Sequence, residues 1–205
     1  RMAGEVVEEV LREFLAAACH MILHSRHIYP REIFERRRLF DVTVFRSRHK
    51  ELNEYIDMAV HGVCELLQRG EADAMVLAVL GPPTLHSPDL HPVVHERYRF
   101  ALSFTPHATT GTSDLSAQLR AFLVKLHFCD SLLSPLRIDA TKLTFRIEAH
   151  SKPVRCLDAL PPELNEQWIE LDTSSELGAS GGSITPLKSM NSGSVSLQLF
   201  VQELG

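Results

Sequence analysis

Residues 113–133 read SDLSAQLRAFLVKLHFCDSLL, and the spacing of their apolar side chains predicts one long helix. One face carries the three- and four-residue spacing of a core stripe. The opposite face is also largely apolar, with Ala117, Arg120, Ala121, Val124, His127 and Phe128. A helix of this kind either lies in the centre of its fold or is covered by a partner. Both alternatives stay open at this point, and both indicate a protein that binds proteins.

The segments on either side of this helix predict the rest of the fold. Further helices are expected over 5–24 and 50–69, the second closed by Gly70. Strands are expected over 39–45, 74–80, 93–105, 141–149 and 195–202. The strand 74–80 is apolar throughout, as in a strand covered on both faces, and we expect it to pair antiparallel with 93–105. Three helices and mostly antiparallel strands predict a single α+β domain over residues 1–205.

Composition excludes several classes of protein. A chain of 205 residues can bury a core without disulfides, and its net charge of −5 argues against a broad nucleic-acid surface. Its four cysteines have no paired spacing, and three of them lie in apolar helical patterns, as in proteins of a reducing compartment. The chain opens without a signal-peptide pattern and has no apolar run of membrane-spanning length. We therefore expect a soluble intracellular protein.

No motif for catalysis or metal binding emerges from the sequence. His20, His24 and His27 share one helical face, but no further ligand lies near them, which favours a polar edge facing solvent over a zinc site. The run from Arg36 to Arg38 is expected to be a solvated helical face rather than a phosphate patch. A G-x-S-x-G elbow, a phosphate-binding glycine loop and a recognisable carboxylate pair are all missing from the sequence. We expect no enzyme, no cofactor and no metal.

The single tryptophan, Trp168, lies in a segment of different character. Ser, Gly, Pro and acidic residues dominate residues 151–183, so an isolated indole there needs a packing partner. One interpretation is that Trp168 fastens this segment to its own domain. The other is that it lines a peptide site, since aromatic residues are frequent anchors at interfaces. The residue pattern leaves both open.

Several strings of residues resemble the HORMA domain family. Ile28-Tyr29-Pro30 followed by Ile33-Phe34 is similar to the junction after the first helix of that family. The strings KELNEYI (50–56), LRAFLVK (119–125), PLK (186–188) and LQLFV (197–201) resemble one branch more closely, the accessory, non-catalytic subunits of translesion DNA polymerase zeta. The similarity extends over residues 6–203. Spindle-checkpoint members share the Tyr-Pro junction but match the second and third helices less well.

The resemblance implies a fold and a set of sites. HORMA domains pack three helices on a sheet, and a C-terminal safety belt, here residues 151–205 after a core of about 5–150, wraps over a peptide that is added as a strand. By similarity, Tyr55 and Trp168 would line the peptide site. A HORMA–HORMA dimer interface would contain Arg120, Val124 and Phe128. A scaffold-polymerase surface would contain Ile184, Gln198 and Phe200.

The function implied by the resemblance is that of an adaptor. Such a protein clamps a proline-containing peptide of the polymerase zeta catalytic subunit and links it to the deoxycytidyl-transferase scaffold polymerase during DNA-damage tolerance. The alternative is a spindle or meiotic checkpoint HORMA protein that clamps a different peptide. We expect a HORMA homo- or heterodimer without direct contact to nucleic acid or membrane. The expected location is the nucleus, with the cytoplasm as a second compartment.

Overall fold

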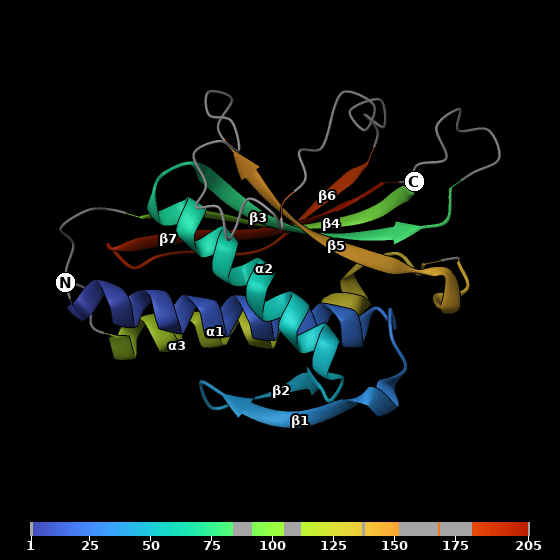
Figure 1. Cartoon of the computed structure of the whole chain (residues 1–205), viewed down its shortest axis with the longest axis horizontal. Coiled ribbons are helices and arrows are strands. Elements are labelled where there is room, and N and C mark those ends of the chain that lie inside the picture. The colour runs from blue at the N-terminus through green and yellow to red at the C-terminus, as the bar shows by residue number, and fades with distance from the viewer. Residues whose placement is uncertain are drawn as a thin grey trace.

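The computed structural model describes residues 2–83, 92–104, 112–136, 138–151, 168 and 182–204 (Figure 1). Its helices are α1 (Met2–Ser25), α2 (Lys50–Gln68) and α3 (Thr112–His127). Its strands are β1 (Phe34–Leu39), β2 (Val42–Ser47), β3 (Ala72–Gly81), β4 (Val93–Phe104), β5 (Thr144–Ser151), β6 (Ser183–Asn191) and β7 (Val195–Glu203). None of the helices in these ranges is both long enough and apolar enough to cross a membrane.

The described strands form one antiparallel sheet and a separate hairpin. The sheet has five strands in the order β5-β3-β4-β7-β6, and the three helices cover one of its faces (Figure 1). The hairpin of β1 and β2 lies on the far side of the helices (Figure 1). The antiparallel pairing of β3 with β4 confirms the expected connection. Three helices on a mostly antiparallel sheet confirm the predicted α+β class.

Helix α1, rather than α3, is the central helix of the fold. It contacts α2, α3 and β2, and its side chains are buried from Leu11 to Leu23 except on one edge. The ring of Phe14 meets Phe122 of α3 edge-on at 5.9 Å and Phe100 of β4 at 6.2 Å. These contacts join both layers at one fully buried side chain. The central position expected as one alternative for α3 is therefore occupied by α1.

The segment between α1 and α2 differs from the prediction. Arg36 to Arg38, expected on a helical face, lie in the strand β1, and the predicted strand 39–45 contains the turn of the hairpin. Phe40 and Asp41 have φ angles of 46° and 60°, the positive values that a type I′ hairpin turn requires at both central positions. Phenylalanine rarely adopts this conformation, so a turn centred on Phe40 was not predicted from the sequence. Arg36, Arg37 and Arg38 are exposed on β1.

Two other boundaries differ from expectation, and one strand was not predicted. The predicted helix 113–133 ends at His127, and a 3-10 turn follows over Cys129–Leu132. Another 3-10 turn, Ala140–Lys142, occupies the start of the predicted strand 141–149. Strand β6 was not predicted, because its sequence SITPLKSMN lacks the apolar alternation of a half-buried strand. It lies at the edge of the sheet, and its pairing register shifts between Pro186 and Lys188. Proline has no N–H to donate to a neighbouring strand, so it is tolerated mainly in edge strands and at such irregularities.

The described cysteines are part of the core. Cys19, Cys64 and Cys129 are buried free thiols, and Cys156 lies outside the described residues. Burial raises the pKa of Cys19 and of Cys64 to about 12, so both stay protonated at neutral pH. The three thiols therefore act as small apolar side chains, as the helical pattern predicted.

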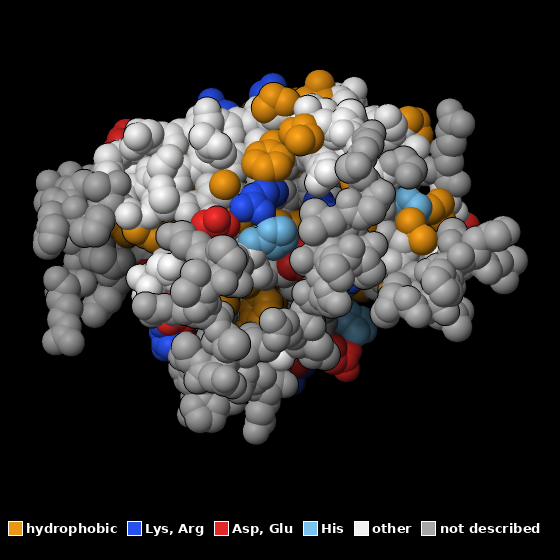
Figure 2. Space-filling view, turned by 90° about the horizontal axis from the view of Figure 1, so that it is seen from above, with side chains coloured by type: hydrophobic (Ala, Val, Ile, Leu, Met, Phe, Trp, Pro, Cys, Tyr) orange, Lys and Arg blue, Asp and Glu red, His pale blue; other side chains and the backbone are white. Residues whose placement is uncertain are grey.

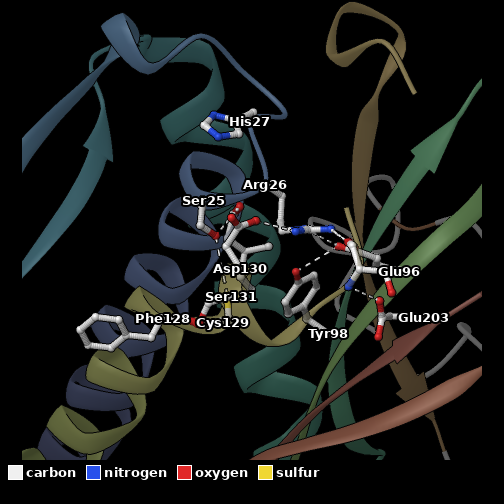
Figure 3. A network of polar contacts seen from close by, with 12 residues as sticks. Ser25, Arg26, His27, Glu96, Tyr98, Phe128, Cys129, Asp130, Ser131 and Glu203 are labelled. Atoms are coloured by element: carbon white, nitrogen blue, oxygen red, sulfur yellow. Dashed lines mark hydrogen bonds and ion pairs between the residues drawn. The ribbon is translucent and has the colours of Figure 1, made fainter. Parts of the chain in front are cut away.

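A buried arginine joins the helical layer to the sheet (Figure 3). Arg26, just after α1, donates from Nε and Nη2 to the two carboxylate oxygens of Glu96 on β4. Its Nη1 is 2.5 Å from Asp130, and Nη2 also donates to the carbonyl of Ser134 at 2.7 Å. Tyr98 donates its hydroxyl to Glu96. Burial opposes both charges, but the bonds to Glu96 and Asp130 raise the pKa of Arg26, and we infer an ionised pair.

The same network reaches the end of the chain. The backbone N–H of Ser134 donates to Glu203 of β7 at 2.7 Å, and the hydroxyl of Ser183 on β6 donates to the other carboxylate oxygen. Burial would raise the pKa of Glu203, but these hydrogen bonds and the charge of Arg26 lower it. Glu203 therefore fastens the C-terminal hairpin to the loop that Arg26 holds.

Replacing Arg26 tests how much this network stabilises the fold. Arg26→Ala should lower the free energy of unfolding by about 3–5 kcal/mol, because Glu96 is left buried without its cation. Arg26→Lys should lower the free energy of unfolding by less, because lysine keeps the positive charge although it cannot make the bidentate contact. Urea denaturation followed by circular dichroism measures both variants. A loss below about 1 kcal/mol for Arg26→Ala would contradict a stabilising role for the pair.

Candidate functional site

One edge of the sheet carries a contact between a backbone N–H and a side chain. In the described part of the chain β5 is the terminal strand and pairs with β3. The N–H of Ile147 on β5 donates to the hydroxyl of Tyr55 on α2 at 3.3 Å. This N–H therefore points away from β3, as alternate residues of an antiparallel strand do. The Tyr55 hydroxyl thus occupies the position where a backbone carbonyl of an additional strand would accept this hydrogen bond.

Aromatic rings line the helical side of this edge. Phe145 on β5 meets Tyr55 edge-on at 5.5 Å and Tyr29 at 6.2 Å. Tyr55 remains 40% exposed, so its ring is available to a ligand. Burial raises the pKa of Tyr55 and of Tyr29, which keeps both as neutral phenols at physiological pH. Phe145 was not predicted as a site residue, although it lies on the apolar face of an alternating strand.

Trp168 lies against the same helix as Tyr55. A Cβ at Gly62 of α2 would be 2.8 Å from the indole Nε1, so the glycine makes room for this ring. Tyr55 and Gly62 are seven residues apart, which places them on one face of α2. Trp168 is half-buried and packs against the core. The two aromatic residues predicted for the peptide site therefore both lie along α2, and Tyr55 contacts β5.

The predicted safety belt starts at one edge of the sheet and ends at the opposite edge. β5 forms one edge, and the hairpin of β6 and β7 forms the other, with β3 and β4 between them. Between β5 and the hairpin in sequence, the structure describes Trp168 and Gly182. The chain from 152 to 182 therefore joins the two edges. Its other residues up to 181 lie outside the described part, so the path of the belt stays a prediction.

The second apolar face of α3 is exposed. Val124 is 41% exposed, Phe128 is 61% exposed, and Arg120 also faces solvent. Leu132 extends this surface into the following 3-10 turn. The predicted core stripe is buried in α3 at Leu115, Leu119, Phe122 and Leu126, and continues to the buried Cys129 in the 3-10 turn. The alternative in which the fold itself covers both faces of α3 is wrong.

A third group of predicted site residues lies on the C-terminal hairpin. Gln198 and Phe200 lie on β7, on the side opposite its core residues. Ile184 lies on the neighbouring β6, where it pairs with Gln202 of β7. The alternation of the strands places all three on the sheet face that points away from the helices. Ile184 is 63% exposed. The structure thus groups residues that lie up to sixteen positions apart in the sequence.

The histidines of α1 are not a solvent-facing edge. His20 is buried, and burial together with the charge of Arg46 lowers its pKa to about 4. His24 stacks on Phe45 of β2 at 3.6 Å, so the hairpin covers it. The expected polar edge is wrong for these two residues, because the hairpin that covers them was not predicted. Within the described ranges no three potential ligands gather to hold a metal ion.

Comparison with known proteins identifies the family. Residues 8–143 match the family model described as HORMA domain. The chain is 32% identical to the mitotic spindle assembly checkpoint protein MAD2B of Danio rerio over 98% of this chain and 92% of that protein. It is 31% identical to the DNA polymerase zeta processivity subunit of Arabidopsis thaliana over 98% of this chain and 86% of that protein.

A solved structure with little sequence similarity has the same fold. A chain in the crystal structure of the mitotic checkpoint complex matches with a TM-score of 0.74 and 17% identity, over 96% of this chain and 97% of that one. The family model, the two relatives and the shared fold agree with the resemblance seen in the sequence. This chain belongs to the HORMA domain family.

Proposed function

We propose that this protein is a non-catalytic adaptor that clamps a proline-containing peptide of the DNA polymerase zeta catalytic subunit. The peptide adds to β5 as a further strand and is held there by the safety belt. The observation that carries the proposal is the Ile147 N–H, which faces away from β3 and is bonded to the Tyr55 hydroxyl. Main-chain hydrogen bonds along such an edge supply affinity, and side-chain pockets supply specificity.

Binding exchanges one hydrogen bond for others. The incoming backbone carbonyl accepts the Ile147 N–H, and the Tyr55 hydroxyl is released to turn toward the ligand. Proline suits this site, because its ring packs on aromatic faces such as those of Tyr55 and Trp168 and brings little conformational entropy to lose. The edge therefore favours an extended, apolar and proline-containing segment.

A checkpoint function is the second candidate. The similarity to proteins named MAD2B supports it, since a checkpoint HORMA protein would clamp a different peptide at the same edge. The similarity to a polymerase zeta processivity subunit supports the first candidate. Pull-down with a catalytic-subunit peptide against a checkpoint peptide separates the two. For the polymerase function we propose a location in the nucleus, with the cytoplasm as a second compartment.

The other two surfaces complete the adaptor. Ile184, Gln198 and Phe200 would bind the deoxycytidyl-transferase scaffold polymerase, since they share one accessible face of the hairpin. The α3 surface of Arg120, Val124 and Phe128 would bind a second HORMA domain as a homo- or heterodimer. Its exposed apolar side chains support a partner there, because monomeric proteins rarely leave large apolar patches in contact with water. Neither surface coincides with the β5 edge.

The peptide site can be tested with three variants. Tyr55→Ala and Trp168→Ala should each weaken peptide binding by about 2 kcal/mol or more, as expected for aromatic anchors. Tyr55→Phe should bind as well as the unmutated protein, because it keeps the ring and no longer holds the Ile147 N–H. Titration calorimetry with the catalytic-subunit peptide measures all three. Unchanged affinity in both alanine variants would remove these residues from the site.

The scaffold surface should be separable from the peptide site. Phe200→Ala should reduce binding of the scaffold polymerase's C-terminal domain and leave the polymerase peptide bound. Phe200→Tyr is the matched control, since it keeps the ring on the same face of β7 and should retain both partners. Surface plasmon resonance with each partner measures the effect. If Phe200→Ala loses both ligands together, the variant has disrupted the hairpin and the two-site interpretation is wrong.

Dimer formation should depend on Arg120. Its guanidinium needs an acceptor across the interface once a partner covers α3, so Arg120→Ala should cost about 2–5 kcal/mol of dimer stability and yield a monomer. Arg36→Ala, an exposed arginine on β1, serves as the control and should leave the dimer intact. Light scattering at several concentrations measures mass. A peptide-bound unmutated protein that is monomeric at high concentration, with or without another HORMA domain, would contradict this interface.

A further inference from the structure

The hairpin of β1 and β2 concentrates positive charge. Residues 31–48 contain six arginines and three carboxylates, an excess of positive charge within a chain whose net charge is −5. All six guanidinium groups belong to exposed residues, namely Arg31, Arg36, Arg37, Arg38, Arg46 and Arg48. A cluster of arginines on one element is the electrostatic footprint of a surface that binds phosphates.

The fold displays this charge on the side of the molecule remote from the sheet. All three helices contact β2, whereas β1 lies farther out (Figure 1). The expectation of a solvated helical face assumed that consecutive arginines point in different directions. In a strand, alternate residues share a face, so Arg36 and Arg38 project together, about 7 Å apart along β1. The structure therefore groups cations that a helix would have separated.

The ion pairs within the hairpin are exposed. They join Arg37 to Glu35, Arg38 to Asp41 and Arg46 to Asp57 of α2, at 2.5, 3.2 and 3.1 Å. Water and salt screen such pairs, so a phosphate can replace the carboxylate. Within the ranges that the structure describes, no carboxylate pairs with Arg36. Arg31 contacts His27, and Arg48 donates to the backbone carbonyl of Glu32.

Protection of a free strand edge does not explain these cations by itself. β1 belongs to a two-stranded sheet, and charged residues on such a strand prevent pairing with other chains. Charge of either sign serves that purpose. The sequence of β1, FERRRL, nevertheless carries three consecutive arginines and one glutamate. The sign of the charge therefore needs a further reason.

The cavity between the hairpin and the helices is not the place for an anion. Its volume is about 650 Å³, and arginines of the hairpin border it. Glu9 and Glu13 of α1 and Asp57 of α2 border it as well, and their carboxylates repel an anion. Arg36 is not part of its lining. The surface that favours anions is therefore the outer side of the hairpin.

The outer face of the sheet has a different balance of charge. Figure 2 shows Lys/Arg, Asp/Glu and His side chains together near the middle of that face. Arg99 of β4 pairs there with Asp73 at 2.9 Å, and Arg146 of β5 pairs with Glu148 at 2.6 Å. Cations and carboxylates are matched on that face, whereas the hairpin carries an excess of cations.

The aromatic residues of the hairpin narrow the class of partner. Phe34 is buried, and Phe40 and Phe45 are half-buried against the core, so no aromatic side chain of residues 31–48 is fully exposed. Peptides are held by apolar anchors, and single-stranded nucleic acids by stacking of bases on exposed rings. Duplex DNA needs neither, because its phosphates supply the affinity and each matches a guanidinium with two parallel hydrogen bonds.

We propose that the outer side of the β1–β2 hairpin binds the phosphate backbone of duplex DNA without reading the base sequence. Arg36 and Arg38 make the central contacts, and Arg31 and Arg48 extend the surface at the base of the hairpin. The expectation of no contact with nucleic acid rested on the net charge of the whole chain, whereas this surface is one element. DNA binding here does not depend on the peptide clamp, because the hairpin and β5 lie on opposite sides of the helices (Figure 1).

The salt dependence of DNA binding measures the number of phosphate contacts. The full chain is titrated into two fluorescein-labelled duplexes of unrelated sequence, and fluorescence anisotropy gives Kd from about 50 to about 200 mM NaCl. Both duplexes should bind equally, with a Kd of about 10⁻⁶ to 10⁻⁴ M near physiological salt. About three phosphate contacts predict a slope of about −3 when the logarithm of the association constant is plotted against that of the salt concentration.

Paired substitutions assign the contacts to the hairpin. Arg36→Ala combined with Arg38→Ala should weaken duplex binding about tenfold or more and make the slope less steep by about 2. Lys125→Ala combined with Lys142→Ala is the matched control, because it removes the same charge from exposed residues outside the hairpin. The control should change Kd by less than about twofold, since distant exposed charges are screened. Circular dichroism verifies folding, and Arg36→Gln with Arg38→Gln replaces the alanine pair if that pair unfolds.

Further ligands test the identity of the partner. Single-stranded DNA of the same length and a glutamate-rich peptide are titrated in the same assay, and tighter binding of either one would overturn duplex DNA as the ligand. No duplex binding at about 50 mM NaCl, or a Kd that the hairpin variant retains or the control loses equally, would overturn the surface. A weaker Kd and a flatter slope in the hairpin variant alone support it. Titration of the catalytic-subunit peptide is a separate readout, so failure of the clamp and failure of DNA binding are distinguishable.

Discussion

The buried pair of Arg26 and Glu96 is the constraint on which the arrangement of the layers depends. Two charges removed from water must satisfy each other, and only one relative position of α1 and β4 allows both guanidinium contacts. The same guanidinium holds Ser134, whose N–H holds Glu203. The end of the central helix, the loop after α3 and the last strand are therefore fixed to one another through a single side chain.

This arrangement separates the functional surfaces. The C-terminal hairpin completes the sheet at the β6 edge, which leaves β5 at the other edge beside α2. A hydroxyl from α2 then satisfies a backbone N–H that a strand partner would take. The surfaces proposed for peptide addition, scaffold contact and α3 pairing thus lie on three different parts of one domain, which suits the proposed adaptor.

Regular patterns were predicted well, and irregular ones were not. The alternation from Glu96 to Leu102 and the apolar stripe of α2 match the buried residues, because burial on one face imposes these periods. The hairpin of β1 and β2 was missed, since its turn uses Phe40 in a rare conformation. Its absence from the prediction also left His20 and His24 on a supposedly solvent-facing edge. One concealed turn accounts for both errors.

Residue patterns alone were enough to predict the fold class, the family and the residue types available for binding. Hydrophobic periodicity fixes which faces are buried, and a few strings such as KELNEYI carry the family resemblance. Contacts between distant segments place α1 at the centre, leave an apolar face of α3 exposed, and bring the Tyr55 hydroxyl to the N–H of Ile147 on β5. The reason is physical: local patterns specify a face, whereas the neighbour of that face depends on contacts between residues far apart in the chain.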